Sequence, residues 1–424
     1  MSRFSKKLSG EEKTVAKNYG ALVVLQGLNY LLPLLIIPFL EHQLGLEKFG
    51  LVMFAQSLMV FFVLITDFGF SITATREIAI LKTENKDYSE VYFKVFWARI
   101  VLVIFCFLLL LILVFSFDKF RINWQLYLLS YGLVVGHAIF PVWFFQGIEK
   151  MRFITVVNVV AKVIFTVLLF LFISSPDDYL NVPIFNSIGF IIAGLLSFLI
   201  SLKSVTWRKP NFISGKAFYK ESLNMFVSNL SSSLYTSFNA FLLGIFGGDI
   251  LVGIYTPFEK LILAAKNMYI PIYQAIFPYM ARKPIEEMRS MMKKLFMAVT
   301  ALGILICAIF TILGEWILGL LFKDPLIVEN VDLFKIMSLI ALFSGINMLF
   351  NVLYFPATKQ FKKLMKIMVV AGVFNAVLSL IIVPIFKLEG TIAAVVSTEF
   401  LLLIIALFLY RKEINNTKPT IVQT

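Results

Sequence analysis

The run VLVIFCFLLLLILVF at residues 101–115 is apolar throughout. A strand of a membrane β-barrel alternates apolar and polar residues over about ten positions, and this run shows no such alternation. It lies inside a longer apolar segment, and a helix needs about 20 such residues to cross the hydrocarbon core of a bilayer. The run therefore predicts transmembrane helices and argues against a barrel.

The composition of the whole chain supports the same interpretation. Of its 424 residues, 60% are hydrophobic and only 15% are charged, and the mean hydropathy is +0.90. Soluble domains carry about 25% charged residues. We therefore expect an integral membrane protein whose structure is all-α.

Twelve predicted spans follow when the chain is divided by this length criterion. They cover residues 16–39, 49–70, 92–117, 125–145, 153–173, 182–202, 223–246, 252–280, 295–318, 331–355, 365–386 and 388–410. A polar, basic segment after the sixth span divides them equally. The predicted architecture is polytopic, with two six-helix bundles around a central cavity: a bundle at 1–203, a cytoplasmic linker at 204–222, a second bundle at 223–410 and a cytoplasmic tail at 411–424.

Basic residues are distributed unevenly between the two sides of the predicted membrane. Of the 38 Lys and Arg residues, 28 lie in or beside the amino terminus, the even-numbered connections and the tail, and five lie in the odd-numbered connections. Cytoplasmic loops carry the excess of Lys and Arg, so both termini are predicted to be cytoplasmic. The net charge of +13 then reflects topology, and we expect no nucleic-acid partner because no soluble segment is large enough to fold alone.

Two further absences limit the chemistry. The two cysteines, Cys106 and Cys307, both fall in apolar spans, where a cysteine usually acts as a small hydrophobic residue. With only two His residues besides, we expect neither a metal site nor a cofactor. The outer connections are short, and the acidic pair there, Glu41 and Glu47, is interpreted as part of a solvated hairpin. No enzymatic site is therefore predicted.

An internal repeat relates the two halves. The segment GLEKFGLVMFAQSL at 45–58 matches GDILVGIYTPFEKL at 248–261, with Gly50 aligned to Gly253. Six spans is an even number, so the repeats have the same membrane orientation. Carriers built from two such halves place substrate between them and alternate access by moving one against the other.

The seventh span, residues 223–246, is unusually rich in Ser and Asn. Small hydroxyl residues also mediate helix packing in bilayers, which accounts for some of them. We favour a water-facing surface for the rest. The residues predicted to line a glycan cavity are Asn29, Gln56, Asn229, Ser232, Tyr235 and Asn239.

The stretch IYTPFEKLILAAKNMYI at 254–270 places Glu259, Lys260 and Lys266 inside an apolar span. A charge at the bilayer centre costs about 2.5–3.5 kcal/mol on insertion scales. Lys162 and Glu399 lie at similar depth in other spans. We therefore expect these groups to face a hydrated interior or one another, with Glu259 and Lys260 as a possible mutual pair.

These features together predict an amphipathic anionic ligand. A lysine ammonium binds phosphate as a mobile point charge, and Lys162 and Lys266 are the main candidates for a diphosphate. Lys260 and Arg99 are further candidates, although Arg99 is also close enough to a span end to extend toward water. Amide and hydroxyl groups suit sugar hydroxyls, so a lipid-linked sugar diphosphate is the predicted ligand class.

Several segments resemble the polysaccharide (O-antigen) flippase family, which belongs to the multidrug/oligosaccharidyl-lipid/polysaccharide exporter superfamily. The resemblance covers the whole chain and is strongest in the first half. The segments that carry it are LQGLNYLLPLLIIPFL at 25–40, LGLEKFGLVMFAQSL at 44–58, TDFGFSITATREIA at 66–79, FPVWFFQGIEKM at 140–151 and EGTIAAVVSTE at 389–399.

The resemblance implies a bacterial inner-membrane protein that moves an undecaprenyl-diphosphate-linked oligosaccharide from the cytoplasmic to the periplasmic leaflet. Asp67, Arg76 and Glu77 correspond to a family motif and are candidates for a cytoplasmic gate or, equally, for a helix-end ion pair. Coupling to H⁺ or Na⁺ through Glu259 or Glu399, and association with a polysaccharide polymerase and a chain-length regulator, are further expectations.

The alternative function is a cation-coupled antiporter of drugs or metabolites from the same superfamily. Multidrug members often carry an acidic group in the first span, whereas residues 16–39 contain no Asp or Glu. This difference favours the flippase, and it leaves the coupling ion open.

Overall fold

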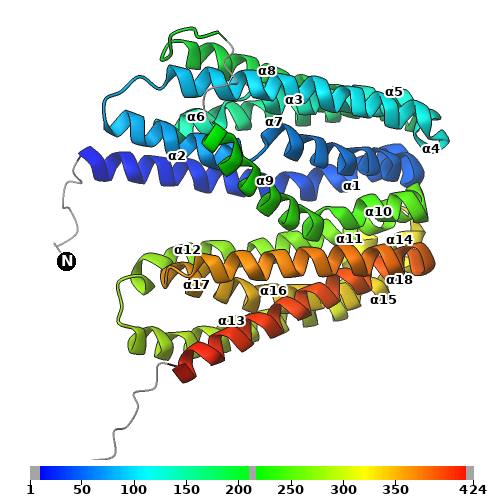
Figure 1. The fold of residues 1–424 in the computed structure, drawn as a ribbon. Helices are drawn as coiled ribbons and strands as arrows, with labels where there is room; N and C mark the ends of the chain where they lie inside the picture. Colours follow the sequence, from blue (N-terminus) through cyan, green and yellow to red (C-terminus); the bar gives the residue numbers. More distant parts are fainter. Residues whose placement is uncertain (1–9, 210–215, 417–424) are drawn as a thin grey trace, which may run out of the picture. The chain divides into compact units, whose positions relative to one another are not determined.

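The structure is a computed structural model that describes residues 10–209 and 216–416, with side chains described outside 10–26, 28–31, 232, 235–236, 285 and 414–416. Within these residues all regular secondary structure is helical. In the first half the helices are α1 (Gly10–Asp67), α2 (Phe70–Thr83), α3 (Ser89–Ser116), α4 (Asp118–Arg121), α5 (Trp124–Ile139), α6 (Val142–Gly147), α7 (Met151–Phe172), the 3₁₀ helix η1 (Pro176–Leu180) and α8 (Asn181–Leu202) (Figure 1).

The second half is divided into more and shorter elements. They are α9 (Lys216–Thr236), α10 (Phe238–Gly247), α11 (Asp249–Asn267), α12 (Tyr269–Met280), α13 (Ile285–Leu321), α14 (Pro325–Glu329), α15 (Val331–Met337), α16 (Leu339–Met348), the π-helical turn η2 (Leu349–Tyr354), α17 (Phe355–Ala357) and α18 (Phe361–Asn416).

Each of the twelve predicted spans corresponds to helical structure. The helices α1 and α18 each contain two spans, separated by sharp reversals at Gly45 (φ 71°) and Lys387 (φ 45°). Among the described residues, eight helical stretches are long and apolar enough to cross a membrane, and α1 and α18 contribute to two of them. The two predicted spans outside these eight are the broken, more polar pairs α9–α10 and α11–α12. The all-α, polytopic fold class is thus confirmed.

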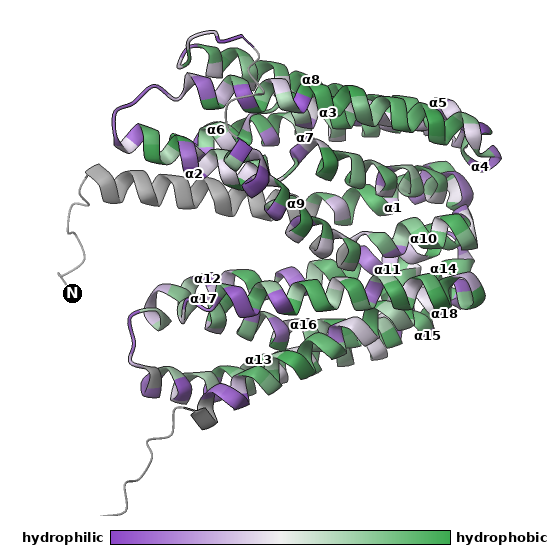
Figure 2. Cartoon of the chain, viewed as in Figure 1, coloured by the Kyte–Doolittle hydropathy of each residue, from purple (hydrophilic) through white to green (hydrophobic). Residues whose placement is uncertain are grey.

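The helix α3 shows how these spans meet lipid. One face exposes large apolar side chains, including Val101, Ile104 and Ile112, each more than half exposed. The opposite face buries Cys106 and Leu110 completely. A contiguous exposed apolar surface of this kind marks contact with a membrane or a partner. Figure 2 shows hydrophobic residues along α3 and α13, and a more hydrophilic α9.

The chain divides into two compact units. The first contains the described residues of Met1–Ile36 and Ala55–Asn229, and the second those of Ile37–Phe54 and Leu230–Thr424. In the first unit α5 and α8 approach closely because they meet at glycines: a Cβ on Gly136 would lie 2.5 Å from the carbonyl carbon of Phe190. An aromatic core around Tyr92, Trp143 and Phe144 completes this unit.

Each unit takes in a segment that the sequence did not assign to it. Residues 37–54 of α1 group with the second unit, where a Cβ on Gly50 would lie 1.9 Å from the Asp249 carbonyl oxygen. Residues 216–229 of α9 group with the first unit, where the hydroxyls of Ser222 and Thr73 lie 2.8 Å apart. Close backbone approach at glycine explains the first of these attachments.

The prediction of a solvated hairpin is wrong for one of its two acidic residues. Glu47 is exposed, but Glu41 is only 2% exposed. Its carboxylate accepts hydrogen bonds of 2.9 Å from the backbone N–H groups of Lys323 and Asp324, before α14. Two donors compensate a buried carboxylate for the water that it loses. Glu41 therefore anchors α1 within the second unit.

Candidate functional site

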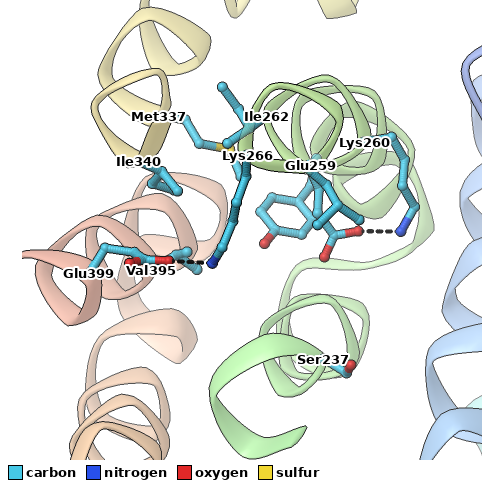
Figure 3. Close-up of a pocket in the computed structure, with 11 residues that line it drawn as sticks. Ser237, Glu259, Lys260, Ile262, Lys266, Met337, Ile340, Val395 and Glu399 are labelled. Carbon is cyan, nitrogen blue, oxygen red and sulfur yellow. Dashed lines mark hydrogen bonds and ion pairs between the residues drawn. The ribbon is translucent and has the colours of Figure 1, made fainter. Parts of the chain in front are cut away.

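A pocket of about 210 Å³ lies within the second unit and contains four charged side chains (Figure 3). Its charged and polar lining comes mainly from α11, with Glu399 from α18 opposite. The complete lining is Ser237, Tyr255, Glu259, Lys260, Ile262, Leu263, Lys266, Met337, Ile340, Val395 and Glu399. Polar groups converging in a concave apolar site are the usual mark of a ligand pocket.

The central interaction of the pocket joins α11 to α18. Lys266 Nζ lies 2.7 Å from Glu399 Oε1, and Figure 3 shows the lysine side chain extended toward that carboxylate. Two side chains of α16 also bind Glu399: Ser344 Oγ donates to Oε1 at 2.7 Å and Asn347 Nδ2 donates to Oε2 at 2.6 Å. A buried charge needs such donors to remain charged, so Glu399 is held as a carboxylate on three sides.

The two members of this ion pair differ in exposure. The Glu399 side chain is 2% exposed, whereas the Lys266 side chain is 25% exposed. Because Lys266 is the more open partner, its ammonium is more accessible from the pocket than the Glu399 carboxylate. The pair therefore favours an anionic group as the incoming ligand.

A second ion pair lies one to two turns away on α11. Lys260 Nζ is 2.6 Å from Glu259 Oε2, which confirms the mutual pair considered from the sequence. Glu259 and Lys266 are seven residues apart, so they project from nearly the same side of the helix. Tyr255, one turn before Glu259, is buried beside them. The opposite face of α11 carries apolar residues that are buried in the core, so the charged face of the helix lines the pocket.

In the first unit the predicted site residues form a different arrangement. Arg99 is 5% exposed and pairs with Asp67, which also accepts a hydrogen bond from Ser71. This cluster lies where α1 ends and a left-handed Gly69 (φ 77°) begins α2. Arg99 thus forms an ion pair with Asp67 at the end of α1, and it does not line the pocket described above.

Arg76 and Lys162 are also in the first unit. Arg76 pairs with Glu221 at 2.5 Å, and both side chains are at least 40% exposed. Asp67 and Arg76 are therefore bound to different partners. Lys162 is a half-buried residue of α7 and does not line the pocket that contains Lys266. The structure brings together Lys260, Lys266, Glu259 and Glu399, and leaves the predicted role of Lys162 untested.

The predicted glycan-lining residues are only partly placed. Asn239 is 1% exposed, and its amide binds Asn375 at 3.2 Å and Ser379 at 2.8 Å. These bonds join α10 to α18, as polar side chains commonly do between helices in a membrane. The buried Asn239 therefore packs between helices instead of lining a cavity. Gln56 and Asn229 are half-buried. The side chains of Asn29, Ser232 and Tyr235 lie outside the described residues.

Two residues of the site were not identified from the sequence, namely Ser344 and Asn347. They are three residues apart in a largely apolar span, a spacing that places both on one face of a helix. Two polar residues on one face at mid-span were the available signal. Among the described residues, no group of three or more His, Cys, Asp or Glu side chains is arranged to hold a metal ion.

Comparison with known proteins establishes the family. The sequence model of the polysaccharide biosynthesis protein family matches residues 15–284, which is more than half of the chain. The chain belongs to this family. Among its relatives is a "Putative O-antigen transporter" of Shigella dysenteriae, 28% identical over 400 residues, with 92% of this chain and 98% of the relative covered. A protein of the same name from Escherichia coli (strain K12) is 24% identical, with 94% and 97% covered.

Solved structures share the fold of this family member. An inward-facing multidrug resistance MATE family transporter of the MOP superfamily has a TM-score of 0.65 at 13% identity, and covers 92% of this chain and 96% of its own. The MATE multidrug transporter DinF-BH has a TM-score of 0.63 at 18% identity, and covers 98% and 99%. At such identities the likeness extends to the fold alone.

Proposed function

We propose that this protein is a flippase that moves a lipid-linked polysaccharide repeat unit across the bacterial inner membrane. The family match and the near full-length similarity to relatives named as O-antigen transporters support transport of such a unit. The observation that carries the site assignment is the partly exposed Lys266 in a pocket of the second unit. The carrier lipid that we propose is undecaprenyl diphosphate.

The pocket limits which part of this ligand it holds. Drug-sized ligands occupy sites of about 300–1,000 Å³, and this pocket measures about 210 Å³. That volume suits a phosphate group or a single sugar and is too small for an oligosaccharide. We therefore assign the diphosphate to Lys266, and the remaining saccharide to surfaces outside the pocket, with Lys162 as a candidate contact.

The direction of transport follows from the charge of the ligand. With both termini cytoplasmic, as the basic residues predict, the anionic unit moves outward across an inside-negative membrane. This movement is favourable by about 2.3 kcal/mol per charge per 100 mV. If the Lys266 ammonium moved across the membrane potential together with the ligand, its positive charge would cancel part of this driving force. We therefore propose that Lys266 does not change its depth in the membrane during transport. H⁺ or Na⁺ coupling through Glu399 or Glu259 belongs to the same proposal.

Genetic complementation tests this function. A deletion strain is supplied with the wild-type gene, with Lys266→Ala, or with Lys335→Ala as a matched control. Lys335 is a lysine of the same unit, paired with Asp332 at 2.8 Å on α15. At equal membrane levels we expect Lys266→Ala to reduce surface polysaccharide at least tenfold and Lys335→Ala to restore it. Full display with Lys266→Ala would reject the assignment.

The same strains separate the flippase from the drug antiporter. A flippase defect leaves lipid-linked repeat units on the cytoplasmic side, where externally added glycosidases do not reach them. A drug antiporter defect instead lowers the drug concentration that inhibits growth and leaves surface polysaccharide intact. Increased drug sensitivity with normal polysaccharide would favour the antiporter.

A further inference from the structure

The carboxylate of Glu399 lies where an anionic ligand of Lys266 would be expected to lie. Lys266 is the open member of the pair, and its ammonium is 2.7 Å from Glu399 Oε1. A phosphate that entered the pocket would compete with this oxygen for the same ammonium. The counter-charge of the site is therefore part of the protein itself.

The neighbours of Glu399 include groups that can accept a hydrogen bond from its carboxyl group after such an exchange. Ser344 and Lys266 both donate to Oε1. A serine hydroxyl is both a donor and an acceptor, so Ser344 can accept a hydrogen bond from Oε1 once this oxygen carries a proton. The Nδ2 atom of Asn347 faces the Glu399 carboxylate, and its Oδ1 atom is buried with no hydrogen-bond partner among the described residues; a flip of the amide would present this oxygen to the carboxyl group as an acceptor.

Burial decides what happens to Glu399 when its cation leaves. A carboxylate that is 2% exposed and loses its cationic partner is driven toward its neutral form by desolvation. Among the described residues that line the pocket, the other groups do not replace that cation: Lys260 is already paired with Glu259, Tyr255 is a phenol, and α15 and α16 contribute the apolar side chains of Met337 and Ile340.

We propose that Glu399 is an exchangeable counter-ion: its carboxylate holds Lys266 until a phosphate displaces it, and Oε1 then takes up one proton from water. In this role Glu399, Ser344 and Asn347 are positioning residues, since none of them binds the phosphate. The inference rests on the proposed function, because it takes a phosphate-bearing ligand at Lys266. It adds that binding of the ligand and uptake of a proton are one linked event.

The experiment measures binding of farnesyl diphosphate to the purified full-length protein in detergent, with farnesol as the probe that lacks phosphate. Linkage of one proton changes affinity by up to about tenfold per pH unit. For the wild-type protein we expect affinity to rise by roughly that factor for each unit as the pH falls from about 8 to about 6. The probe itself gains negative charge as pH rises, so its own ionisation acts in the opposite direction.

Glu399→Gln is the decisive variant, because its amide resembles the protonated carboxyl while Lys266 and the probe are unchanged. We expect it to bind farnesyl diphosphate about tenfold more tightly than the wild type at about pH 8, with the acid-dependent gain abolished. Calorimetry in two buffers of different ionisation heat should show one proton fewer taken up by the variant. Equal pH slopes and equal proton uptake in the two proteins would overturn the inference.

Two further variants keep the outcomes separate. Lys266→Ala should lose binding of farnesyl diphosphate; if it binds as the wild type does, the phosphate site in the proposed function fails together with the counter-ion. If Lys266 is required but the Glu399→Gln variant behaves as the wild type does, only the counter-ion fails. Ser344→Ala retains the carboxyl group but removes a bond to the charged form in the free protein and only a weaker bond to the neutral form in the complex. It should therefore tighten binding severalfold at about pH 8; weaker binding would contradict the exchange, even if Glu399→Gln does not fold.

Discussion

Two ion pairs among the described residues, each with one closely buried member, have opposite polarity with respect to water. In the first unit the cation is closed off, with the Arg99 side chain 6% exposed and that of Asp67 18% exposed. In the second unit the carboxylate is closed off, with the Glu399 side chain 2% exposed and that of Lys266 25% exposed. The exposed partner decides which charge can compete for the pair, so only the second pair is suited to an incoming anion.

The chemistry of the two cations supports this difference. A guanidinium does not lose its proton in proteins and forms planar bonds to a carboxylate, whereas an ammonium is a mobile point charge. Arg99 therefore holds the turn between α1 and α2 in place, beside the left-handed Gly69. Lys266 lies in a pocket and can change partner. We interpret the first pair as structural and the second as part of transport.

The largest expected effect on stability comes from breaking the Arg99–Asp67 pair, the closed pair, in which the cation is the buried member. Asp67→Asn leaves the Arg99 charge buried without its carboxylate, and breaking a buried pair in this way costs about 3–5 kcal/mol. We expect a corresponding loss in the free energy of unfolding in detergent, followed by circular dichroism. The double variant Asp67→Asn with Arg99→Met should recover most of the loss, since no unpaired charge remains. A single variant as stable as the wild type would remove the distinction between the pairs.

The buried carboxylate of Glu41 is held mainly by backbone donors, with the His42 imidazole Nε2 3.6 Å away. Its principal bonds come from two backbone N–H groups at 2.9 Å, and hydrogen bonds to charged groups contribute about 1.5–3 kcal/mol. Glu41→Gln replaces one acceptor oxygen by a donor, so we expect a loss of about that size in unfolding free energy. The exposed neighbour supplies the control, because Glu47→Gln should leave stability unchanged within experimental error.

Replacing the lysine of the Lys266–Glu399 pair by arginine tests whether the kind of cation explains the difference between the two pairs. Lys266→Arg retains the positive charge but offers Glu399 a planar guanidinium that holds it more firmly. We expect equal or higher thermal stability and about tenfold lower surface polysaccharide in the complementation assay. Wild-type display by this variant would show that exchange of partner is not required at this position.

The smallest effect is expected at an exposed carboxylate near the start of α3. Ser89 donates through its hydroxyl and its backbone N–H to Asp87, and these bonds lower the pKa of that carboxyl below its usual value. Arg208 lies 3.0 Å away, and exposed pairs contribute less than about 1 kcal/mol.

Because the pKa of Asp87 is lower in the folded state, its stabilising contribution is complete above the unfolded pKa and is lost as the pH falls through the folded one. Asp87→Asn should therefore reduce stability slightly at about pH 6 and not at about pH 2, as measured by thermal unfolding in the same detergent. A difference that grows toward acid pH would contradict this assignment.

The sequence was most informative where long apolar runs decide structure. Each predicted span is helical because a chain in lipid must satisfy its backbone hydrogen bonds internally. It was also correct that Glu259 pairs with Lys260, which adjacent opposite charges in an apolar span make favourable. It predicted that Lys266 and Glu399 face a hydrated interior or another charge, but it did not specify that they pair with each other across 133 residues, since nothing local in either segment specifies the other.

Other site predictions failed for the same reason. Asn239 and Glu41 were interpreted by residue type, as a cavity-lining amide and a solvated carboxylate. Both are buried, at 1% and 2% exposure, because the partners that satisfy them come from distant elements. Ser344 and Asn347 were passed over because small polar residues in apolar spans are common in helix packing.

The amino-acid sequence by itself determined that this protein is an all-α, multi-pass membrane protein, because hydropathy and span length are local properties. Only the tertiary structure decided which charges meet and which member of each pair faces a pocket. Those outcomes depend on contacts between helices far apart in the chain, and desolvation at those contacts fixes whether a charge is closed off or available to a ligand.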